Sequence, residues 1–265
     1  MNLTHTRLTN FKLRQIVQSA DGSHTIFLPD LKEHFHSIHG ALQESFHVFI
    51  QQGFLQVPAI DGPVLVLGGP VSILEVGFGT GLNGLLTLLY AQAKGIRVRY
   101  TALEAYPLQE EEYLALNYPG EIAARPSVEQ CGVQDGGPFG IPHNSYSRAM
   151  LGSMFTAMHA GAWERPIEPV PGFVLEKRRV LVEEAELLPD QFDLVYFDAF
   201  APRVQPGVWT MQVFGKIFCA MKPGGLLVTY SATGELKRTL KGCGFVLEHP
   251  AGPPGKREMT RALKP

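Results

Sequence analysis

Residues 73–83 read I-L-E-V-G-F-G-T-G-L-N, and this stretch decides the fold. The apolar run Val71–Val76 predicts a buried strand, and the helical pattern Leu82–Ala93 begins directly after glycines at positions 77, 79 and 81. Glycines at such a turn let the backbone bend tightly and approach a ligand closely. The dinucleotide-binding fingerprint requires glycine at position 82, where this chain has leucine, so the spacing argues against NAD.

Strand and helix patterns alternate along the rest of this region. The predicted strands are Val98–Leu103, Val180–Val182, Phe192–Phe197, Leu226–Tyr230 and Phe245–Leu247, and the predicted helices are Leu108–Asn117, Trp209–Met221 and Gly234–Lys241. We expect Phe245–Leu247 to be the last central strand and Arg257–Leu263 to return as an antiparallel edge strand. This alternation predicts an α/β protein with a parallel sheet and helices on both faces.

The first 69 residues have a different pattern, which predicts a small N-terminal subdomain. Asp21-Gly22 separates two strand-like runs, as in a β-hairpin, and Gly40–Gln52 has apolar residues at helical spacing. We therefore expect a hairpin and helix subdomain at 1–69 and a Rossmann-like domain at 70–265. Residues 118–172 are rich in glycine and proline, which predicts an irregular insertion, a lid or a binding element, with one helix near 150–159.

Composition excludes several classes of protein. The 265 residues suffice for one large domain or two small ones, and 45% are hydrophobic, which excludes general disorder. The net charge of −2 excludes a uniformly basic coat, although residues 221–265 hold eight Lys or Arg against three Glu. Three widely spaced cysteines predict neither a disulfide scaffold nor a zinc site. No secretory signal or membrane span is visible, so we expect a cytoplasmic protein.

Two carboxylates beside the glycine turn favour S-adenosylmethionine (SAM) as the ligand. Glu75 precedes the first glycine, where a carboxylate can receive the ammonium group of a methionine but would repel a pyrophosphate. Glu104 ends the next predicted strand, where a carboxylate can accept hydrogen bonds from both ribose hydroxyls. The alternative is a tight strand-to-helix turn that binds no ligand.

A second loop follows the predicted strand Phe192–Phe197 and reads D-A-F-A-P-R-V-Q-P-G-V-W over residues 198–209. Ligands of open α/β sheets gather at the carboxyl ends of the strands, so we expect Asp198 beside the cofactor crevice. Its carboxylate can accept a proton from a nucleophilic amine, and Phe200 can stack on a planar substrate. The alternative is that Asp198 caps a turn and Phe200 belongs to the core.

Several motifs together resemble the methyltransferase domain of the MnmC family, the tRNA 5-methylaminomethyl-2-thiouridine biosynthesis proteins. They are D-G-S-x-T at 21–25, H-S-x-x-G-A-x-x-E-S-x-x-V-F at 36–49, E-V-G-F-G-T-G-L-N at 75–83, D-A-F-A-P with P-x-x-W at 198–209, G-G-x-L-V-T-Y at 224–230 and G-K-R-x-M at 255–259. The glycine motif marks only the cofactor class, whereas the block at 36–49 and the D-A-F-A-P loop are much more specific.

The resemblance implies a class I SAM-dependent methyltransferase fold, with the hairpin layer and the insertion added to it. The implied reaction is N-methylation of 5-aminomethyl-(2-thio)uridine at the wobble position, and the implied partner is the anticodon loop of tRNA. A separate flavin-dependent oxidase is expected to act upstream, because the family's flavin domain is not part of this sequence.

The patterns and the resemblance together define a candidate site. The expected catalytic residues are Asp198 and Phe200, and the expected cofactor residues are Glu75, Gly77, Gly79, Gly81, Asn83, Glu104 and Glu184, of which Glu184 would read the adenine amine. The expected substrate residues are His36, Ser37, Glu44, Pro202, Lys256 and Arg257, with ion pairing as the alternative for the last two. No metal site is expected, because the nearby histidines lack a converging pattern of acidic or cysteine partners.

Other functions fit the same sequence. A methyltransferase or aminopropyl transferase acting on a small amine would use the same fold, and the long insertion suits a closed pocket. A non-catalytic SAM-binding module is a third class, against which the intact Glu75, Glu104 and Asp198 argue. The basic segment 221–265 is either a surface that contacts tRNA phosphates or an ordinary solvated face.

Overall fold

The structure, a computed structural model, describes residues 14–57, 69–125 and 146–265. Its strands are β1 (Gln15–Gln18), β2 (His24–Leu28), β3 (Glu33–His34), β4 (Val71–Val76), β5 (Val98–Leu103), β6 (Pro166–Val170), β7 (Phe173–Arg178), β8 (Phe192–Phe197), β9 (Met221–Thr229), β10 (Val246–Glu248) and β11 (Thr260–Leu263). Its main helices are α2 (Ala41–Ser45), which continues as a π-helical segment Phe46–Gln51, α4 (Leu82–Lys94), α5 (Glu110–Leu114), α6 (Tyr118–Ala123), α8 (Arg148–Ala160), α9 (Met211–Ala220) and α10 (Gly234–Gly242).

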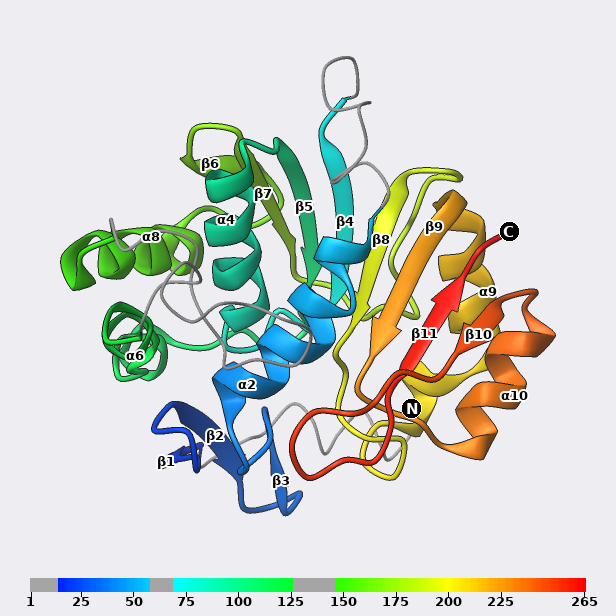
Figure 1. Ribbon diagram of the computed structural model, residues 1–265, viewed down its shortest axis with the longest axis horizontal. Helices are drawn as coiled ribbons and strands as arrows, with labels where there is room; N and C mark the ends of the chain where they lie inside the picture. The colour runs from blue at the N-terminus through cyan, green and yellow to red at the C-terminus, as the bar shows by residue number, and fades with distance from the viewer. Residues whose placement is uncertain (1–13, 58–68, 126–145) are drawn as a thin grey trace.

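Eight strands form one sheet in the order β10-β11-β9-β8-β4-β5-β7-β6 (Figure 1). β4 pairs in parallel with β8 on one side and with β5 on the other, and β9 and β7 continue the parallel arrangement outward. The chain leaves β4 toward β5 and later returns to the other side of β4 at β8. β4 therefore lies at the topological switch point, where open α/β sheets bind their ligands. The predicted α/β fold with a parallel central sheet is confirmed.

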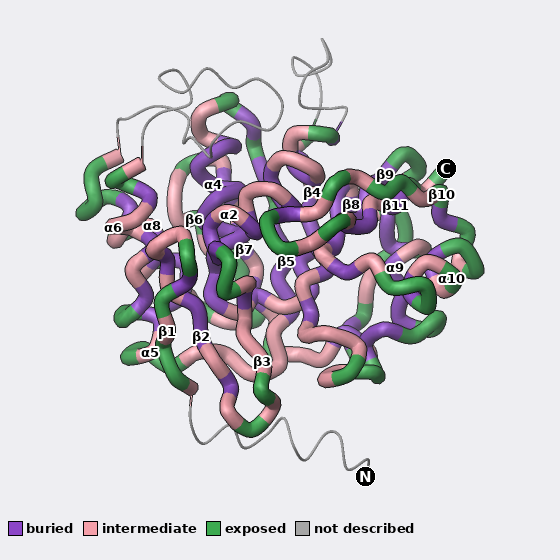
Figure 2. Tube along the Cα trace, turned by 60° about the horizontal axis from the view of Figure 1, so that its bottom comes forward, coloured by how far each residue is buried: buried purple, intermediate pink, exposed green. Residues whose placement is uncertain are grey.

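Helices cover both faces of this sheet because neighbouring residues of a strand point to opposite faces. In β4, Ile73 packs into the core that contains α4, whereas Leu74 packs into the core that contains α9. In β8, Tyr196 packs into the core that contains α4, and Phe197 packs into the core that contains α9. Figure 2 shows the central strands and α4 as the buried centre of the molecule. Strands buried on both faces are mostly apolar in sequence, which is why β4, β5 and β8 were predictable.

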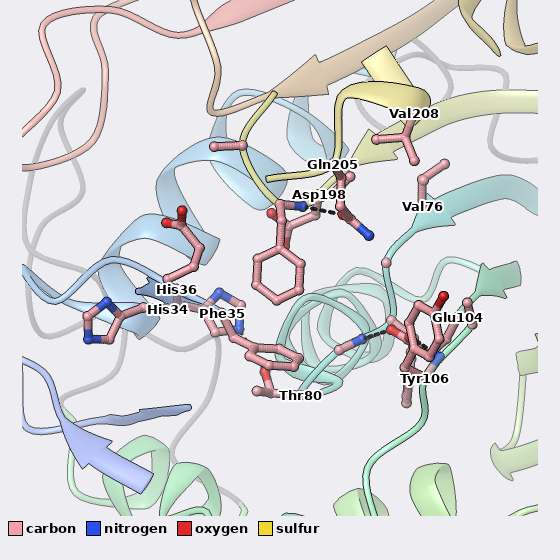
Figure 3. A pocket seen from close by; sticks show the side chains of 18 of the residues that line it. His34, Phe35, His36, Val76, Thr80, Glu104, Tyr106, Asp198, Gln205 and Val208 are labelled. Atoms are coloured by element: carbon pink, nitrogen blue, oxygen red, sulfur yellow. Dashed lines mark hydrogen bonds between the residues drawn. The ribbon is translucent and has the colours of Figure 1, made fainter. Parts of the chain in front are cut away.

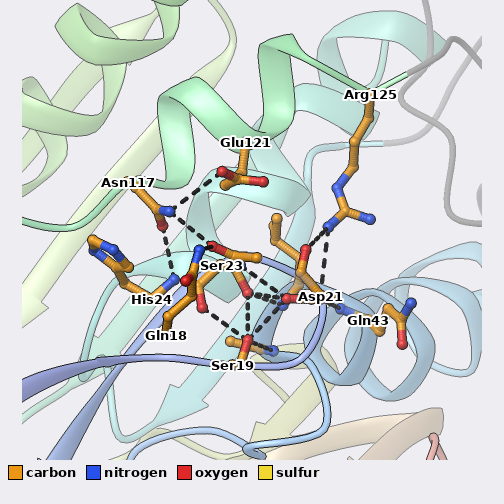
Figure 4. A network of polar contacts seen from close by, with 12 residues as sticks. Gln18, Ser19, Asp21, Ser23, His24, Gln43, Asn117, Glu121 and Arg125 are labelled. Carbon is orange, nitrogen blue, oxygen red and sulfur yellow. Dashed lines mark hydrogen bonds and ion pairs between the residues drawn. The ribbon is translucent and has the colours of Figure 1, made fainter.

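The N-terminal layer is a three-stranded antiparallel sheet, β1-β2-β3, with the predicted hairpin turn at Asp21-Gly22. A polar network attaches this turn to its neighbours (Figure 4). Asp21 Oδ2 accepts a hydrogen bond from the Gln43 amide of α2 at 3.0 Å and lies 3.7 Å from Arg125. Burial acts to raise the pKa of Asp21, but the hydrogen bonds that it accepts outweigh burial and lower the pKa. The carboxylate therefore stays ionised and fastens the hairpin to α2.

Two predicted strands differ from the structure at the edges of the sheet. Val180–Val182 lies in a turn, and the strand beside β5 is β7, which carries three charged residues after Leu175. Phe173, Leu175 and Lys177 are buried, so the strand alternates although its sequence is polar. At the other end, β11 is antiparallel as predicted but lies between β9 and β10. β10 is therefore an edge strand, and the expectation of a central strand at Phe245–Leu247 is wrong.

The stretch predicted as an irregular insertion, 118–172, contains regular elements where the structure describes it. α8 confirms the helix expected near 150–159, and α6 and β6 were not expected. Residues 126–145, the richest in glycine and proline, lie outside the described residues. The helix expected at Leu108–Asn117 is limited to α5. The division of the chain after residue 69 stays a prediction, and one buried apolar cluster contains Ile26, Phe49 and Ile73 from both sides of it. No helix within the described ranges is long and apolar enough to cross a membrane.

Candidate active site

A cavity of about 340 Å³ lies at the carboxyl ends of β4, β5 and β8. Figure 3 shows Glu104 and Tyr106 on one side of it, His34 and His36 on the other, and Asp198 between them. The wall also includes the turn after β7 and two residues from the C-terminal part of the chain, Tyr230 and Lys256. This volume lies within the range of about 300–1,000 Å³ that small-molecule sites occupy.

The glycine turn after β4 forms the floor of the cavity. Gly77 has a φ of 93°, and a Cβ atom there would lie 2.6 Å from the carbonyl oxygen of Asp198. Only glycine therefore allows β4 and the loop after β8 to approach so closely. Gly79 also lines the cavity, whereas Gly81, at the N-terminus of α4, does not.

Glu104 is fixed at the end of β5 by two backbone amides. Its Oε2 accepts a hydrogen bond from Gly79 at 2.9 Å, and its Oε1 accepts one from Tyr106 at 2.7 Å. Each carboxylate oxygen can accept more than one hydrogen bond, so the group keeps acceptor capacity toward the cavity that it lines. Glu104 lies at the end of β5 as predicted and lines the cavity, and its role in binding ribose stays a prediction.

Asp198 follows β8 and is half-buried in the cavity wall. Its backbone amide donates to Val76 at 3.0 Å, and its Oδ2 accepts a hydrogen bond from Asn83 at 2.8 Å. Burial raises the pKa of Asp198 to about 7, and the nearby Glu44 carboxylate adds to this rise, while Asn83 and Lys256 oppose it. A carboxyl group with this pKa can change its protonation state near neutral pH.

The loop after Asp198 is held by three hydrogen bonds along its backbone. The amide of Phe200 donates to the Gln205 side chain at 3.0 Å, and Trp209 Nε1 donates to the Phe200 carbonyl at 2.8 Å. The hydroxyl of Tyr230 donates to the Ala199 carbonyl at 2.9 Å. These contacts fix the backbone on both sides of Phe200, whose side chain lines the cavity.

The N-terminal part of the chain contributes residues of the block at 36–49, which the sequence analysis singled out. His36 Nε2 lies 2.7 Å from the Thr80 hydroxyl of the glycine turn, and burial lowers the pKa of His36 to about 4, so its ring is neutral. Glu44 accepts a hydrogen bond from the Ser37 amide at 2.9 Å and pairs with Lys256 at 2.6 Å. The structure thus brings these four expected substrate residues, His36, Ser37, Glu44 and Lys256, to one side of the cavity.

Two expected cofactor residues lie beneath the cavity and not in its wall. Glu75 shares a strand face with Ile73, so it points under α4 and has no exposed surface. The expectation that it receives an ammonium group directly does not fit this position. Asn83 is 2% exposed and donates hydrogen bonds to both Glu75 and Asp198.

The acid expected to read adenine, Glu184, also lies outside the cavity wall. Glu184 is exposed and outside the cavity, whereas Glu183 lines it, and Glu183 Oε2 is buried without a hydrogen-bond partner among the described residues. Lys216 donates to the carbonyls of Val182, Glu183 and Ala185 and so fixes this turn. Pro202 and Arg257, two expected substrate residues, do not line the cavity.

Some wall residues were missed by the sequence analysis, chiefly Phe35, Tyr106 and Glu183. Each lies within two positions of a residue that was singled out, and this closeness in sequence was the available signal. Within the described ranges, no three His, Cys, Asp or Glu side chains are grouped so that they could hold a metal ion.

The basic residues near the C-terminus are mostly paired. Lys222, Lys237, Arg261 and Lys264 make ion pairs with Asp193, Glu258, Glu248 and Asp190 respectively, and Lys256 pairs with Glu44. Arg238, Lys241 and Arg257 have no ion-pair partner in the part of the chain that the structure describes. Lys256 is therefore both an ion-pair partner, as the alternative interpretation expected, and a residue of the cavity wall.

Comparison with known proteins agrees with the resemblance seen in the motifs. Residues 174–265 match the profile of a family described as S-adenosyl-L-methionine-dependent methyltransferase. The chain is 30% identical over 242 residues to the tRNA 5-methylaminomethyl-2-thiouridine biosynthesis bifunctional protein MnmC of Pseudomonas fluorescens Pf-5, an alignment that covers 86% of this chain and 31% of that protein. It is 26% identical over 243 residues to MnmC of Pseudomonas syringae pv. tomato, covering 88% of this chain and 32% of that protein.

The chain thus spans about a third of the length of the curated relatives that it matches. Among solved structures, MnmC2 from Aquifex aeolicus superposes with a TM-score of 0.67 at 22% identity, over 95% of this chain and 70% of that chain. The resemblance to MnmC proteins and the class I methyltransferase fold predicted from the sequence are confirmed.

Proposed function

We propose that this chain, which has the fold and the family signature of SAM-dependent methyltransferases, methylates the amine of 5-aminomethyl-(2-thio)uridine at the wobble position of tRNA. The observation that carries the proposal is Asp198, a half-buried carboxyl group with a pKa of about 7 beside Phe200 in the cavity. An amine becomes a nucleophile only after it loses its proton, and a base with a pKa near neutrality is suited to accept it. The names of the curated relatives support this substrate.

The cavity wall fits the adenosine part of SAM. Glu104 is suited to the ribose hydroxyls, and Glu183 has a buried oxygen without a partner among the described residues, which fits the exocyclic amine of adenine. Gly79 brings the backbone to the edge of the same cavity without a side chain. When bound, SAM supplies a methyl group on a sulfonium centre that an amine can attack.

The residues of the chain would then act on the second substrate. Phe200 offers a ring against which a uracil base can stack, in line with the way that proteins hold single-stranded bases. Asp198 would orient the amine and accept its proton, so that the lone pair is free. Holding the two reactants in one cavity supplies much of the remaining rate enhancement.

Incubation with methyl-labelled SAM tests the function directly. The substrates to compare are tRNA carrying 5-aminomethyluridine, the same tRNA without the modification, and free polyamines. We expect label only in the modified tRNA, and nuclease digestion should return it in 5-methylaminomethyluridine. Label in the polyamines and none in tRNA would assign the chain to small amines and overturn the proposal. The upstream flavin-dependent oxidase and the cytoplasmic location stay predictions.

A further inference from the structure

Asn83 joins two carboxyl groups beneath the cavity. Its Nδ2 donates a hydrogen bond to Glu75 Oε1 at 3.0 Å and another to Asp198 Oδ2 at 2.8 Å. The two hydrogens of the amide are therefore both used, one for each carboxyl group. Both partners of Nδ2 are carboxyl oxygens that can accept a hydrogen bond, which fits the orientation of the amide seen here.

Glu75 holds the amide from the side away from the cavity. It comes from β4 and has no exposed surface, and burial, with the nearby Asp198 charge, raises the pKa of Glu75 well above its usual value. A neutral carboxyl group still accepts a hydrogen bond at Oε1. Glu75 can therefore fix Asn83 without placing a second negative charge beside Asp198.

We propose that Asn83 is the positioning residue for Asp198 and that the hydrogen bond to Glu75 holds the Asn83 amide in place. In this proposal, Asn83 is not a ligand of the cofactor. The hydrogen bond to Oδ2 fixes the plane of the Asp198 carboxyl group. Oδ1, which receives no hydrogen bond from the described residues, is left for the substrate amine. This inference rests on the proposed role of Asp198 as the base.

Other charged and titratable groups also face Asp198, and they come from separate elements. Glu44 of α2 and Lys256 of the loop before β11 act on its charge in opposite directions. Tyr230 follows β9, and burial, together with the Asp198 charge, raises the pKa of its phenol. None of these groups is in the hydrogen-bond chain through Asn83, so a change at Asn83 alone leaves them in place.

The test replaces Asn83 with leucine, which has a similar shape and no hydrogen-bonding group. The Asp198 carboxyl group is one of seven aspartates, so 13C labelling of aspartate and NMR titration can follow it, with Asp198→Asn as the assignment control. Loss of a hydrogen bond to the charged form raises a pKa. We expect the Asp198 pKa to rise by about one unit or more in Asn83→Leu. The single-turnover rate at neutral pH should fall about tenfold or more, and SAM affinity should stay within about threefold.

Two further variants keep the test decisive if Asn83→Leu does not fold. Glu75→Gln retains an oxygen that can hold the Asn83 amide, whereas Glu75→Leu does not. The rate loss in Glu75→Gln should therefore be smaller than in Glu75→Leu by about fivefold or more, which is about 1 kcal/mol. Equal losses in the two variants would show that Glu75 does not act through the amide.

Asn117 provides a matched control, because its side-chain amide also makes two hydrogen bonds that join separate elements, here the hairpin and α6. Its Oδ1 accepts from the His24 amide at 2.7 Å, and its Nδ2 donates to the Gly22 carbonyl at 2.9 Å. Asn117→Leu should lower thermal stability and leave the titration of Asp198 unchanged. The inference is overturned if Asp198 titrates in Asn83→Leu as in the wild type, or if Asn117→Leu shifts it equally.

The NMR titration needs neither SAM nor tRNA, so it separates this inference from the proposed function. A wild-type protein that does not methylate modified tRNA would defeat the proposed function, while a shifted Asp198 titration in Asn83→Leu would still support the positioning role. A fully active wild type with an unshifted titration in Asn83→Leu would defeat the positioning role alone.

Discussion

Phe35 and Phe200 meet edge to face in the wall of the cavity, with ring centroids 5.1 Å apart and planes at 83°. Phe35 comes from the N-terminal layer, and Phe200 comes from the loop after β8. A Cβ atom on Gly79 would lie 3.2 Å from Phe35, so the same ring also covers the glycine turn. The N-terminal layer therefore packs against the aromatic ring on which the proposed substrate would stack.

Replacing the two rings should raise the KM for modified tRNA to different extents. Stacking of a base on an aromatic side chain contributes about 1–3 kcal/mol, so Phe200→Leu should raise KM roughly fivefold to a hundredfold. An aromatic pair contributes about 0.5–1.5 kcal/mol, so Phe35→Leu should raise KM about two- to tenfold. Because Phe35 acts through Phe200, the double variant should resemble Phe200→Leu. Additive effects in steady-state kinetics would show that the rings act independently.

Glu183 and Glu184 form a natural pair of test and control for the adenine end of the cavity. Glu183 lines the cavity with an oxygen that has no partner among the described residues, and Glu184 is exposed outside it. A hydrogen bond to a charged acceptor contributes about 1.5–3 kcal/mol, so Glu183→Gln should weaken SAM binding about tenfold to a hundredfold. Glu184→Gln should leave the affinity within about twofold. Calorimetric titration of both variants measures this, and the reverse order would restore the assignment made from the sequence.

The central part of the fold was predictable because its strands are buried on both faces. β4, β5 and β8 are mostly apolar, and the residues that follow them, Gly77, Glu104 and Asp198, line the cavity. A parallel sheet brings the carboxyl ends of its strands to one edge, so their closeness followed from the pattern alone. The edges of the sheet were less predictable: Lys177 is buried in β7 and donates to the His159 carbonyl, a contact that no local pattern indicates.

Side-chain direction was the harder part of the site to predict. Glu75 and Glu104 both lie near the ends of parallel strands, but Glu75 precedes the last residue of β4 and points under α4. Glu183 and Glu184 are neighbours in a turn. A turn lacks the alternation of a strand, so the sequence does not show which of the two side chains points into the cavity. In both cases, a shift of one position along the chain decides whether a carboxyl group lines the cavity or points away from it.

The unpaired basic residues should carry the salt dependence of tRNA binding. Arg238, Lys241 and Arg257 lack ion-pair partners within the described ranges, whereas Lys222 and Lys264 are paired with Asp193 and Asp190. Each phosphate contact contributes roughly 0.7–0.9 to the slope of log affinity against log salt. Replacing Arg238, Lys241 and Arg257 with alanine should reduce this slope by about one to three. Replacing Lys222 and Lys264 should change the slope less. Equal slopes in all proteins would make the basic segment an ordinary solvated face.

His36 should make the protein less stable in acid. Burial lowers its pKa to about 4, so the unfolded chain binds the proton more readily between about pH 6.5 and 4. Stability that depends on the neutral ring is complete above about pH 6.5 and falls by about 3 kcal/mol as the pH drops to 4. His36→Gln, which can still bond Thr80 but does not titrate, should lose correspondingly less stability over this range. Urea unfolding at several pH values measures the difference, with the exposed His39→Gln as the unaffected control.

The rate of methyl transfer should rise with pH through about 7, because Asp198 can accept a proton only when it is ionised. Its raised pKa of about 7 means that the folded protein holds it largely protonated below neutrality. Single-turnover measurements with saturating SAM and modified tRNA should therefore show half of the maximal rate near pH 7. A profile that is flat from pH 5.5 to 8.5 would contradict the assignment of Asp198 as the base.

Asp198→Asn should separate binding from chemistry. The amide keeps the shape of the side chain but cannot take the proton of the amine, and general-base catalysis typically contributes about 10²–10⁴-fold. We expect the single-turnover rate at neutral pH to fall by about two decades or more, roughly 2.7 kcal/mol, while SAM affinity stays within about threefold. The rise of the rate with pH near 7 should disappear in this variant. Higher pH should recover part of the rate, because solvent can then deprotonate the amine. The wild-type loop geometry should persist in this variant, since the oxygen of the new amide can still accept the hydrogen bond that Asn83 Nδ2 donates to Asp198 Oδ2. A variant that methylates at nearly the wild-type rate at neutral pH would leave Asp198 as a structural partner of Asn83 and place the base elsewhere in the cavity.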